Sequence, residues 1–439
     1  MKIAVVSLGC PKNQADADVF CRALIEDGHN TVPQVEQAEA VIINTCGFIQ
    51  SAKEEAIEAI LNACSAKKEN PDLKVVVTGC LAERYREELS DEIPEVDAVV
   101  GIGANGTLPQ IMRELSGTQQ PALHFARKTD LPLGGSRIIS TPGHYAWLKI
   151  AEGCSHNCSY CAIPAIRGPL RSRPFEDCVQ EAKWLAEQGV REVVLVAQDV
   201  TAYGDDLGRN RLCELLRALD EIEGLHWIRL LYAYPERITE ELLQTIAASR
   251  HVLPYLDLPI QHIDDGILRS MRRVGDSATI RGALRMIRRI LPKAVLRTTL
   301  IAGYPGETEE QYQTLCNFVE EAKFDRLGCF AYSPEEGTSA AKMDNQLEEE
   351  EKQRRANDIM EIQSRIMAQK QEAYIGKTIE VVCDGMDEDE AYWLCRSAAD
   401  APEIDANVLV DASYPMQEGQ FYNVYVTAAD EVDLYASME

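Results

Sequence analysis

A short segment with three cysteines reads Ile150-Ala-Glu-Gly-Cys154-Ser-His-Asn-Cys158-Ser-Tyr160-Cys161-Ala-Ile-Pro164. A 4Fe-4S cluster normally takes four cysteine ligands, so three thiolates in one loop would leave one iron without a protein ligand. That open iron would be the reactive feature. A zinc site wants four ligands, usually as spaced CxxC pairs, and a disulfide has no use for a third cysteine. The spacing therefore predicts an iron-sulfur cluster on Cys154, Cys158 and Cys161.

Three more cysteines follow predicted strands near the start of the chain. Apolar strands over 3–8, 40–44 and 74–78 alternate with helical patterns and are followed by Cys10, Cys46 and Cys80. This alternation predicts a doubly wound parallel sheet, in which ligands lie beyond the carboxyl ends of the strands. Any one of these cysteines could be a buried apolar thiol, but three at equivalent positions favour a second cluster. The other eight cysteines are interpreted as structural.

Six further strand patterns alternate with helices after the linker. They predict a partial (β/α)6 barrel like an incomplete TIM barrel, with its site at the carboxyl ends of the strands. The Cys154–Cys161 loop follows the first of these strands. Polar or turn-forming residues follow three others, namely Gln198, Asp199, Gln261, His262, Gly303, Tyr304, Pro305 and Gly306. Their common location predicts a cofactor pocket, although ordinary turn chemistry would also explain each one.

Four nearby residues have two possible roles on sequence grounds. His262 is either a structural or a catalytic histidine. Arg167, Arg171 and Arg173 either hold a carboxylate through paired hydrogen bonds or form a solvated basic turn. A charged amphipathic helix over 346–375 receives no chemical role.

Changes in composition and turn-rich segments divide the chain into four parts. We predict an N-terminal domain over 1–117, a turn-rich linker over 118–143, a core over 144–375 and a small all-β module over 376–439. No apolar run approaches the roughly 20 residues of a membrane span, so no membrane association is expected. Fourteen cysteines in a chain of this length favour metal binding in a reducing cytoplasm.

The excess of acidic residues indicates which class of macromolecule the chain binds. The net charge is −27, and residues 376–439 hold fifteen Asp and Glu against two Lys and Arg. An RNA-binding face needs a basic groove beside aromatic platforms. The acidic module therefore favours a basic protein partner, with a surface kept acidic only for solubility as the alternative.

The cysteine loop closely resembles that of radical S-adenosylmethionine enzymes. Together with Cys10, Cys46, Cys80 and an OB-like C-terminal module of the TRAM type, the whole chain resembles the methylthiotransferase family. Val6-Ser-Leu-Gly-Cys10-Pro-Lys-Asn13, Asn44-Thr-Cys-Gly-Phe-Ile49 and Tyr332-Ser-Pro-Glu-Glu-Gly-Thr338 resemble the branch that modifies ribosomal protein S-twelve. The residues Gln14–Asp18 differ from the sequence motif that is usual at this position in that branch.

The resemblance implies two 4Fe-4S clusters and two S-adenosylmethionine molecules. One molecule supplies a methyl group to sulfur at the N-terminal cluster. The other is cleaved at the Cys154/Cys158/Cys161 cluster to give a radical that removes hydrogen from the β-carbon of an aspartate in a basic ribosomal protein. Tyr160, Gln198, Asp199, Gly303, Pro305 and Gly306 are the expected cofactor contacts, and an external electron donor is required.

Three alternatives follow from the same sequence. The first is methylthiolation of adenosine in tRNA, which the acidic charge makes less favourable. The others are an iron-sulfur electron carrier and a ribosome-binding factor without enzymatic activity.

Overall fold

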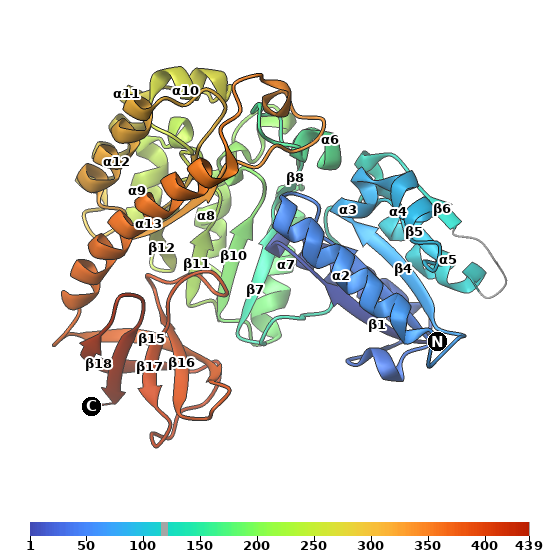
Figure 1. Cartoon of the computed structure of the whole chain (residues 1–439). Helices are drawn as coiled ribbons and strands as arrows, with labels where there is room; N and C mark the ends of the chain where they lie inside the picture. Colours follow the sequence, from blue (N-terminus) through green and yellow to red (C-terminus); the bar gives the residue numbers. More distant parts are fainter. Residues whose placement is uncertain (116–121, 439) are drawn as a thin grey trace. The chain divides into compact units, whose positions relative to one another are not determined.

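The computed structural model describes residues 1–115 and 122–438 (Figure 1). Internal contacts divide the chain into two units. The first unit comprises Met1–Ser140, Lys149–Arg173 and Ser333–Ala341, and the second comprises Thr141–Leu148, Pro174–Tyr332 and Lys342–Glu439. Within the described ranges, every helix is too short or too polar to cross a membrane.

A six-stranded parallel sheet forms the centre of the first unit, in the order β2-β1-β3-β4-β5-β6. Its strands are β1 (Lys2–Ser7), β2 (Asn30–Val32), β3 (Ala40–Thr45), β4 (Lys74–Gly79), β5 (Ala98–Val100) and β6 (Ala122–His124). Its helices are α1 (Pro11–Glu26), α2 (Gln50–Ala66), α3 (Cys80–Arg84), α4 (Arg86–Glu92) and α5 (Leu108–Glu114). The cysteine loop adds the short elements β8 (Ala151–Glu152), α6 (Ile163–Arg167) and β9 (Arg171–Ser172).

Helices cover both faces of this sheet, because successive side chains of each strand point to opposite faces. On one face, Ile42 and its neighbours pack against α1 and α5. On the other, Val41 and Ile43 pack against α2, α3 and α4. The predicted doubly wound parallel sheet is confirmed.

One strand of this sheet lies in the segment interpreted as a linker. β6 pairs with β5 although it falls within residues 118–143. It has only three residues and lacks a long apolar run, so the sequence pattern did not reveal it. The predicted boundary between residues 117 and 118 lies outside the described residues.

The second unit contains a six-stranded sheet in the sequential order β14-β13-β12-β11-β10-β7. Its strands are β7 (Tyr145–Lys149), β10 (Glu192–Val196), β11 (Trp227–Leu230), β12 (Val252–Asp257), β13 (Val295–Ala302) and β14 (Arg326–Ala331). Its helices are α7 (Phe175–Glu187), α8 (Leu212–Asp220), α9 (Glu240–Ala248), α10 (Asp265–Ser270), α11 (Ser277–Ile290), α12 (Glu309–Ala322) and α13 (Glu349–Glu372). The first and last strands are not neighbours, so this is the partial barrel expected from the sequence.

A small closed barrel follows α13, with its strands in the order β15-β16-β17-β19-β18. The strands are β15 (Thr378–Met386), β16 (Tyr392–Ser397), β17 (Val408–Asp411), β18 (Phe421–Ala429) and β19 (Leu434–Met438). Apolar side chains from all five strands fill its interior. The expected OB-like module is confirmed, with β19 as a strand that the sequence reading did not include.

Several acidic residues of this module contact the partial barrel. Asp400 lies 2.5 Å from Arg326, and Asp405 lies 3.6 Å from Arg297. Glu192 of β10 accepts hydrogen bonds from Arg229 at 2.7 Å and from Arg396 of the module at 2.8 Å. Part of the acidic charge therefore holds the module on the barrel and does not face a partner.

Candidate functional site

Cys10, Cys46 and Cys80 follow three strands that are adjacent in the first sheet. Cys10 precedes α1 after β1, Cys46 follows β3, and Cys80 begins α3 directly after β4. Since β1, β3 and β4 are parallel neighbours, their carboxyl ends lie at one edge. Burial raises the pKa of Cys80 most, and Cys10 and Cys46 raise it further, so both thiols lie near Cys80. Cys10 likewise raises the pKa of Cys46 after burial.

Gly9 makes room beside Cys46. It has a φ of +90°, and a Cβ at this position would lie 2.6 Å from the Cβ of Cys46. Real Cβ atoms do not approach so closely, so a side chain here would displace Cys46. A glycine is thus required where the first two cysteine turns meet.

Two asparagines brace the same turns. The Asn13 side-chain amide donates to the Leu8 carbonyl at 2.8 Å and the Thr45 carbonyl at 3.2 Å. The Asn44 amide donates in return to the Asn13 carbonyl at 2.8 Å. Both side chains are buried, so this exchange fixes the backbone that carries Cys10 and Cys46. Asn13 and Asn44 stand in the motifs quoted above, but sequence reasoning assigned them no role.

Arg167 connects the cysteine loop to Cys80. It lies in α6, six residues after Cys161, and is 2 % exposed. Its Nε and Nη2 lie 3.3 and 3.2 Å from the Cys80 Sγ. Nη1 also donates to Asp16 at 2.6 Å and to Glu152 at 3.0 Å. Arg167 is therefore neither a solvated turn residue nor available to bind an incoming carboxylate.

The Arg167 cluster, which we define as Arg167, Lys149, Asp16 and Glu152, is balanced in charge. Lys149 pairs with Asp16 and lies 3.1 Å from Glu152. All four side chains are buried. Burial by itself would lower the pKa of Arg167, but its contacts with the Cys80 sulfur and with the Glu152 and Asp16 carboxylates raise it well above its usual value. The guanidinium therefore stays charged.

Burial disfavours the thiolate form of Cys80. Burial raises its pKa to about 12, while Arg167 acts in the opposite direction. Burial likewise raises the pKa of Cys46, with a further contribution from the charge of Cys10. Ligation of a metal requires thiolates, so Arg167 supplies compensating positive charge where a thiolate would form.

Arg171 and Arg173 bind backbone carbonyls. Arg171 Nη1 donates to the Thr129 carbonyl at 2.7 Å. Arg173 Nη1 donates to the Lys149 carbonyl at 2.9 Å. These bonds hold loop segments of the first unit in place, an arrangement that differs from both alternatives considered from the sequence.

The Cys154–Cys161 loop lies in the first unit together with the N-terminal sheet. Cys154 and Cys158 are each 8 % exposed, and Cys161 and Tyr160 are partly exposed. Cys80 packs in one cluster with Ala162, which directly follows the loop, and with Ile166 of α6. The described residues contain no group of three His, Cys, Asp or Glu side chains already placed to hold a metal ion.

Residues 333–341 tie the loop to the sheet, and this segment was not recognised as part of the site from the sequence. The Ala340 amide donates to the Ser159 carbonyl at 2.8 Å. Glu335 is buried and accepts from Lys53 at 3.0 Å and from Arg84 at 2.7 Å. One segment thus holds both the cysteine loop and the helices next to Cys46 and Cys80.

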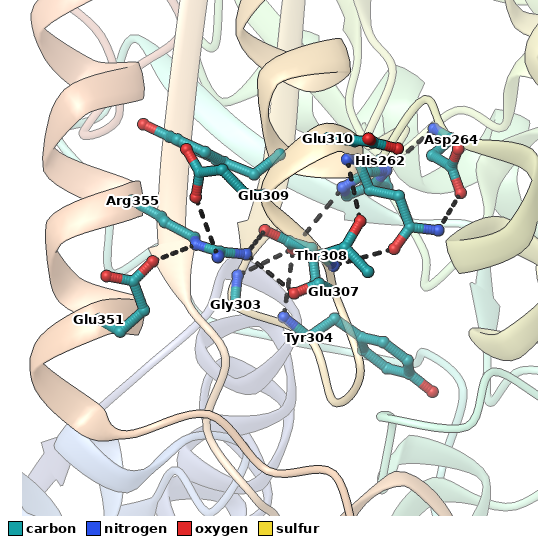
Figure 2. A network of polar contacts seen from close by, with 12 residues as sticks. His262, Asp264, Gly303, Tyr304, Glu307, Thr308, Glu309, Glu310, Glu351 and Arg355 are labelled. Carbon is teal, nitrogen blue, oxygen red and sulfur yellow. Dashed lines mark hydrogen bonds and ion pairs between the residues drawn. The ribbon is translucent and has the colours of Figure 1, made fainter.

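The turn at Gly303 belongs to the second unit and is organised by Glu307 (Figure 2). Glu307 Oε2 accepts from the Gly303 amide at 2.9 Å and the Tyr304 amide at 3.3 Å. Arg355 of α13 donates to Glu307 Oε1 at 2.9 Å. A helix that received no role from its sequence therefore supports the predicted cofactor turn.

His262 supports the same network. Its Nδ1 accepts from the Asp264 amide at 2.9 Å, so Nε2 is the nitrogen that carries hydrogen. Nε2 lies 3.6 Å from Glu307 Oε2, and the ring is fully buried. Figure 2 shows His262 and Arg355 on opposite sides of Glu307. This geometry favours the structural role for His262.

The remaining predicted cofactor residues are also in the second unit. Gln198 is partly exposed, whereas Asp199 is 2 % exposed and accepts from the Thr201 amide at 2.9 Å. Pro305 is buried and Gly306 is exposed. Asp199 thus shapes the turn that carries Gln198.

Comparison with known proteins assigns three segments of the chain. Residues 2–101 match Uncharacterized protein family UPF0004, residues 148–319 match the Radical SAM superfamily, and residues 375–438 match the TRAM domain. Among solved structures, the radical S-adenosylmethionine methyltransferase TsrM from Kitasatospora setae has a TM-score of 0.55 at 15 % identity. That similarity covers 76 % of this chain and 74 % of TsrM, and it concerns the fold alone.

Curated relatives match over nearly their full length. The ribosomal protein uS12 methylthiotransferase RimO of Clostridioides difficile (strain 630) is 47 % identical over 99 % of this chain and 98 % of the relative. RimO of Aquifex aeolicus (strain VF5) is 44 % identical over 99 % of this chain and 96 % of the relative. The chain therefore belongs to the RimO family of radical S-adenosylmethionine methylthiotransferases.

Proposed function

We propose that this chain transfers a methylthio group to the β-carbon of an aspartate in ribosomal protein uS12. S-adenosylmethionine serves both as methyl donor and as radical source. The observation that carries the proposal is the packing of Cys80 against Ala162 and Ile166. It supports a reaction in which the two cysteine triads act on one substrate.

The residues around the N-terminal triad fit an iron-sulfur cluster. Cys10, Cys46 and Cys80 would hold one cluster, and Cys154, Cys158 and Cys161 the other. Gly9 allows Cys46 to lie close to the Cys10 turn, and Arg167 offers two N–H groups to Cys80. When bound, the clusters and S-adenosylmethionine supply one-electron sulfonium cleavage and a sulfur source.

The protein's own residues orient these groups. Arg167 stabilises the Cys80 thiolate through charge-assisted N–H···S contacts. Asn13 and Asn44 hold the Cys10 and Cys46 turns. Cys80, Cys154 and Cys158 are buried, whereas Cys10, Cys46 and Cys161 are partly exposed.

We assign S-adenosylmethionine binding to Tyr160, Gln198, Asp199, Gly303, Pro305 and Gly306. The Gly303 and Tyr304 amides are both used by Glu307. The turn would therefore contact the cofactor through its other backbone groups, and its fixed conformation would shape the binding site. Glu307, His262 and Arg355 act as positioning residues for that turn.

Charge supports a protein substrate over tRNA. Arg396, one of the two cations of the C-terminal module, is 2 % exposed and paired with Glu192 and Asp384. The acidic side chains of Glu388, Asp389 and Glu390 are exposed on the same module. Such a surface repels phosphates and attracts a basic partner.

We place the reaction in the cytoplasm, with an external electron donor.

The decisive experiment offers the reconstituted enzyme both uS12 and tRNA with S-adenosylmethionine and a reductant. Mass spectrometry should find one methylthio group in place of hydrogen on the aspartate-containing peptide of uS12, with tRNA adenosine unchanged. An unchanged peptide together with a modified adenosine would assign the enzyme to tRNA. Formation of no 5'-deoxyadenosine would favour an electron carrier or a ribosome-binding factor.

A further inference from the structure

An apolar groove with an acidic rim lies in the first unit, between α2 and α4. It encloses about 520 Å³, and segment 333–341 contributes Pro334 and Glu336 to its wall. Ile57 and Leu61 of α2 line it and are 39 % and 48 % exposed. Leu89 and Ile93 line it from the opposite side. Large apolar side chains gathered in one exposed groove are typical of a binding surface.

The rim of this groove is negatively charged. Glu88, Glu92 and Glu336 line it and are exposed. Among the described residues, Lys53 is the cation that lines the groove, and its Nζ is paired with Glu335 at 3.0 Å. The groove therefore presents apolar surface between carboxylates. A nucleic acid would meet like charge here, whereas a basic polypeptide with an apolar side chain would find complementary groups.

The groove also lies next to the first cysteine triad in the chain. Leu81, which follows Cys80, lines the groove, and so does Gln50 at the start of α2. A Cβ on Gly47, which follows Cys46, would lie 2.7 Å from the Leu81 amide nitrogen, so the Cys46 turn rests against α3. A peptide bound in the groove would thus lie beside the backbone that carries Cys46 and Cys80.

We propose that this groove binds a basic segment of the protein substrate, with an apolar side chain of that segment between Ile57 and Leu61. The groove would anchor the substrate beside the triad while the modified aspartate reaches the site. The inference rests on the proposed function and adds a docking surface to it.

The first test measures binding of fluorescently labelled uS12 to the reconstituted full-length enzyme by anisotropy. Leu61→Asp should weaken binding by about tenfold, as expected for the loss of an apolar anchor. Leu123→Asp is the matched control, because Leu123 lies on β6 outside the groove and is 47 % exposed. Both variants should keep wild-type iron content, thermal unfolding and 5'-deoxyadenosine formation without uS12.

The second test changes the rim charge. The double variant Glu88→Lys/Glu92→Lys should weaken uS12 binding and reduce its dependence on salt. The double variant Glu87→Lys/Asp91→Lys makes the same charge change on α4 at exposed positions outside the groove lining and should have a smaller effect. Comparing the two pairs separates the groove from the general field of an acidic protein.

Different results would overturn different claims. If wild-type enzyme binds and modifies uS12, and the groove variants do so equally well, the groove proposal is wrong and the proposed function stands. If wild-type enzyme neither binds nor modifies uS12, the proposed function itself fails. Competition by tRNA for the groove would also overturn the assignment of a basic polypeptide.

Discussion

Arg167 is a buried cation at the centre of the first unit's polar contacts. It is buried with two carboxylates and a thiol, and each of its three nitrogens has a partner. A charge in such a place is stable only when it is paired. Its contacts reach Asp16 and Asn13 in α1, Cys80 in α3, and Glu152 beside the cysteine loop. One side chain thus links the segments that carry both triads.

Replacement of Arg167 should destabilise the protein and impair the first cluster. Arg167→Gln leaves Asp16 and Glu152 with only Lys149, and loss of one buried partner typically costs about 3 kcal/mol. Thermal unfolding should show the loss, and iron analysis should show a reduced content. Arg167→Lys should retain more stability but shift the reduction potential of the cluster, because the paired N–H···S contacts are lost. Arg365→Gln, at an exposed pair with Glu320, should change stability by less than about 0.5 kcal/mol.

At the scale of elements, the Gly303 turn and α13 depend on each other. Gly303 has a φ of +72°, and a Cβ there would lie 2.9 Å from the Lys352 Cα of α13. The turn can therefore keep its shape only without a side chain. Its glycine is required both by the backbone angle and by the neighbouring helix.

Gly303→Ala should lower stability by about 1–3 kcal/mol and weaken S-adenosylmethionine binding. Gly282→Ala is the matched control, because an added Cβ on Gly282 in α11 would meet no atom within 4 Å beyond its chain neighbours and the nearby backbone of its own helix. This control should be neutral or stabilising by up to about 1 kcal/mol. Calorimetric titration with S-adenosylmethionine and thermal unfolding measure both effects. Equal behaviour of the two variants would contradict the account.

Glu351 gives α13 a pH-dependent contact. Hydrogen bonds from Arg354 and then Arg355 lower its pKa from 4.5 to about 2. A lowered pKa in the folded state means that the stabilisation is complete above pH 4.5 and is lost as the pH falls toward about 2. Glu351→Gln should therefore lower the unfolding temperature at neutral pH, and the difference from wild type should shrink in acid. Glu350→Gln removes a carboxylate at an exposed position of the same helix and is the matched control.

The sequence predicted the long elements and the cysteine positions well, for identifiable reasons. The strands before Cys10, Cys46 and Cys80 are continuous apolar runs, so their ends could be located. β2, β5 and β6 have three residues each and give no comparable pattern. The roles of Arg355 and Glu335 depend on contacts with residues far away in the chain. Such pairings leave no local signal in a single sequence.

At the scale of the whole molecule, the acidic composition serves more than one purpose. Asp400 and Asp405 lie beside arginines of the partial barrel, whereas Glu88 and Glu92 line an open groove. Counting charges along the sequence could not distinguish acidic residues that pair with arginines from acidic residues that line an exposed groove. The structure separates internal pairing in the second unit from an exposed acidic surface in the first.

The central claim is a division of labour between two cysteine triads, and iron analysis with product analysis tests it most directly. Wild-type enzyme should hold about eight irons, and each triple Cys→Ala variant about four. The Cys154/Cys158/Cys161 variant should form no 5'-deoxyadenosine. The Cys10/Cys46/Cys80 variant should still form it but leave uS12 without a methylthio group. Methylthiolated uS12 from either variant, or wild-type enzyme with only about four irons, would contradict the account.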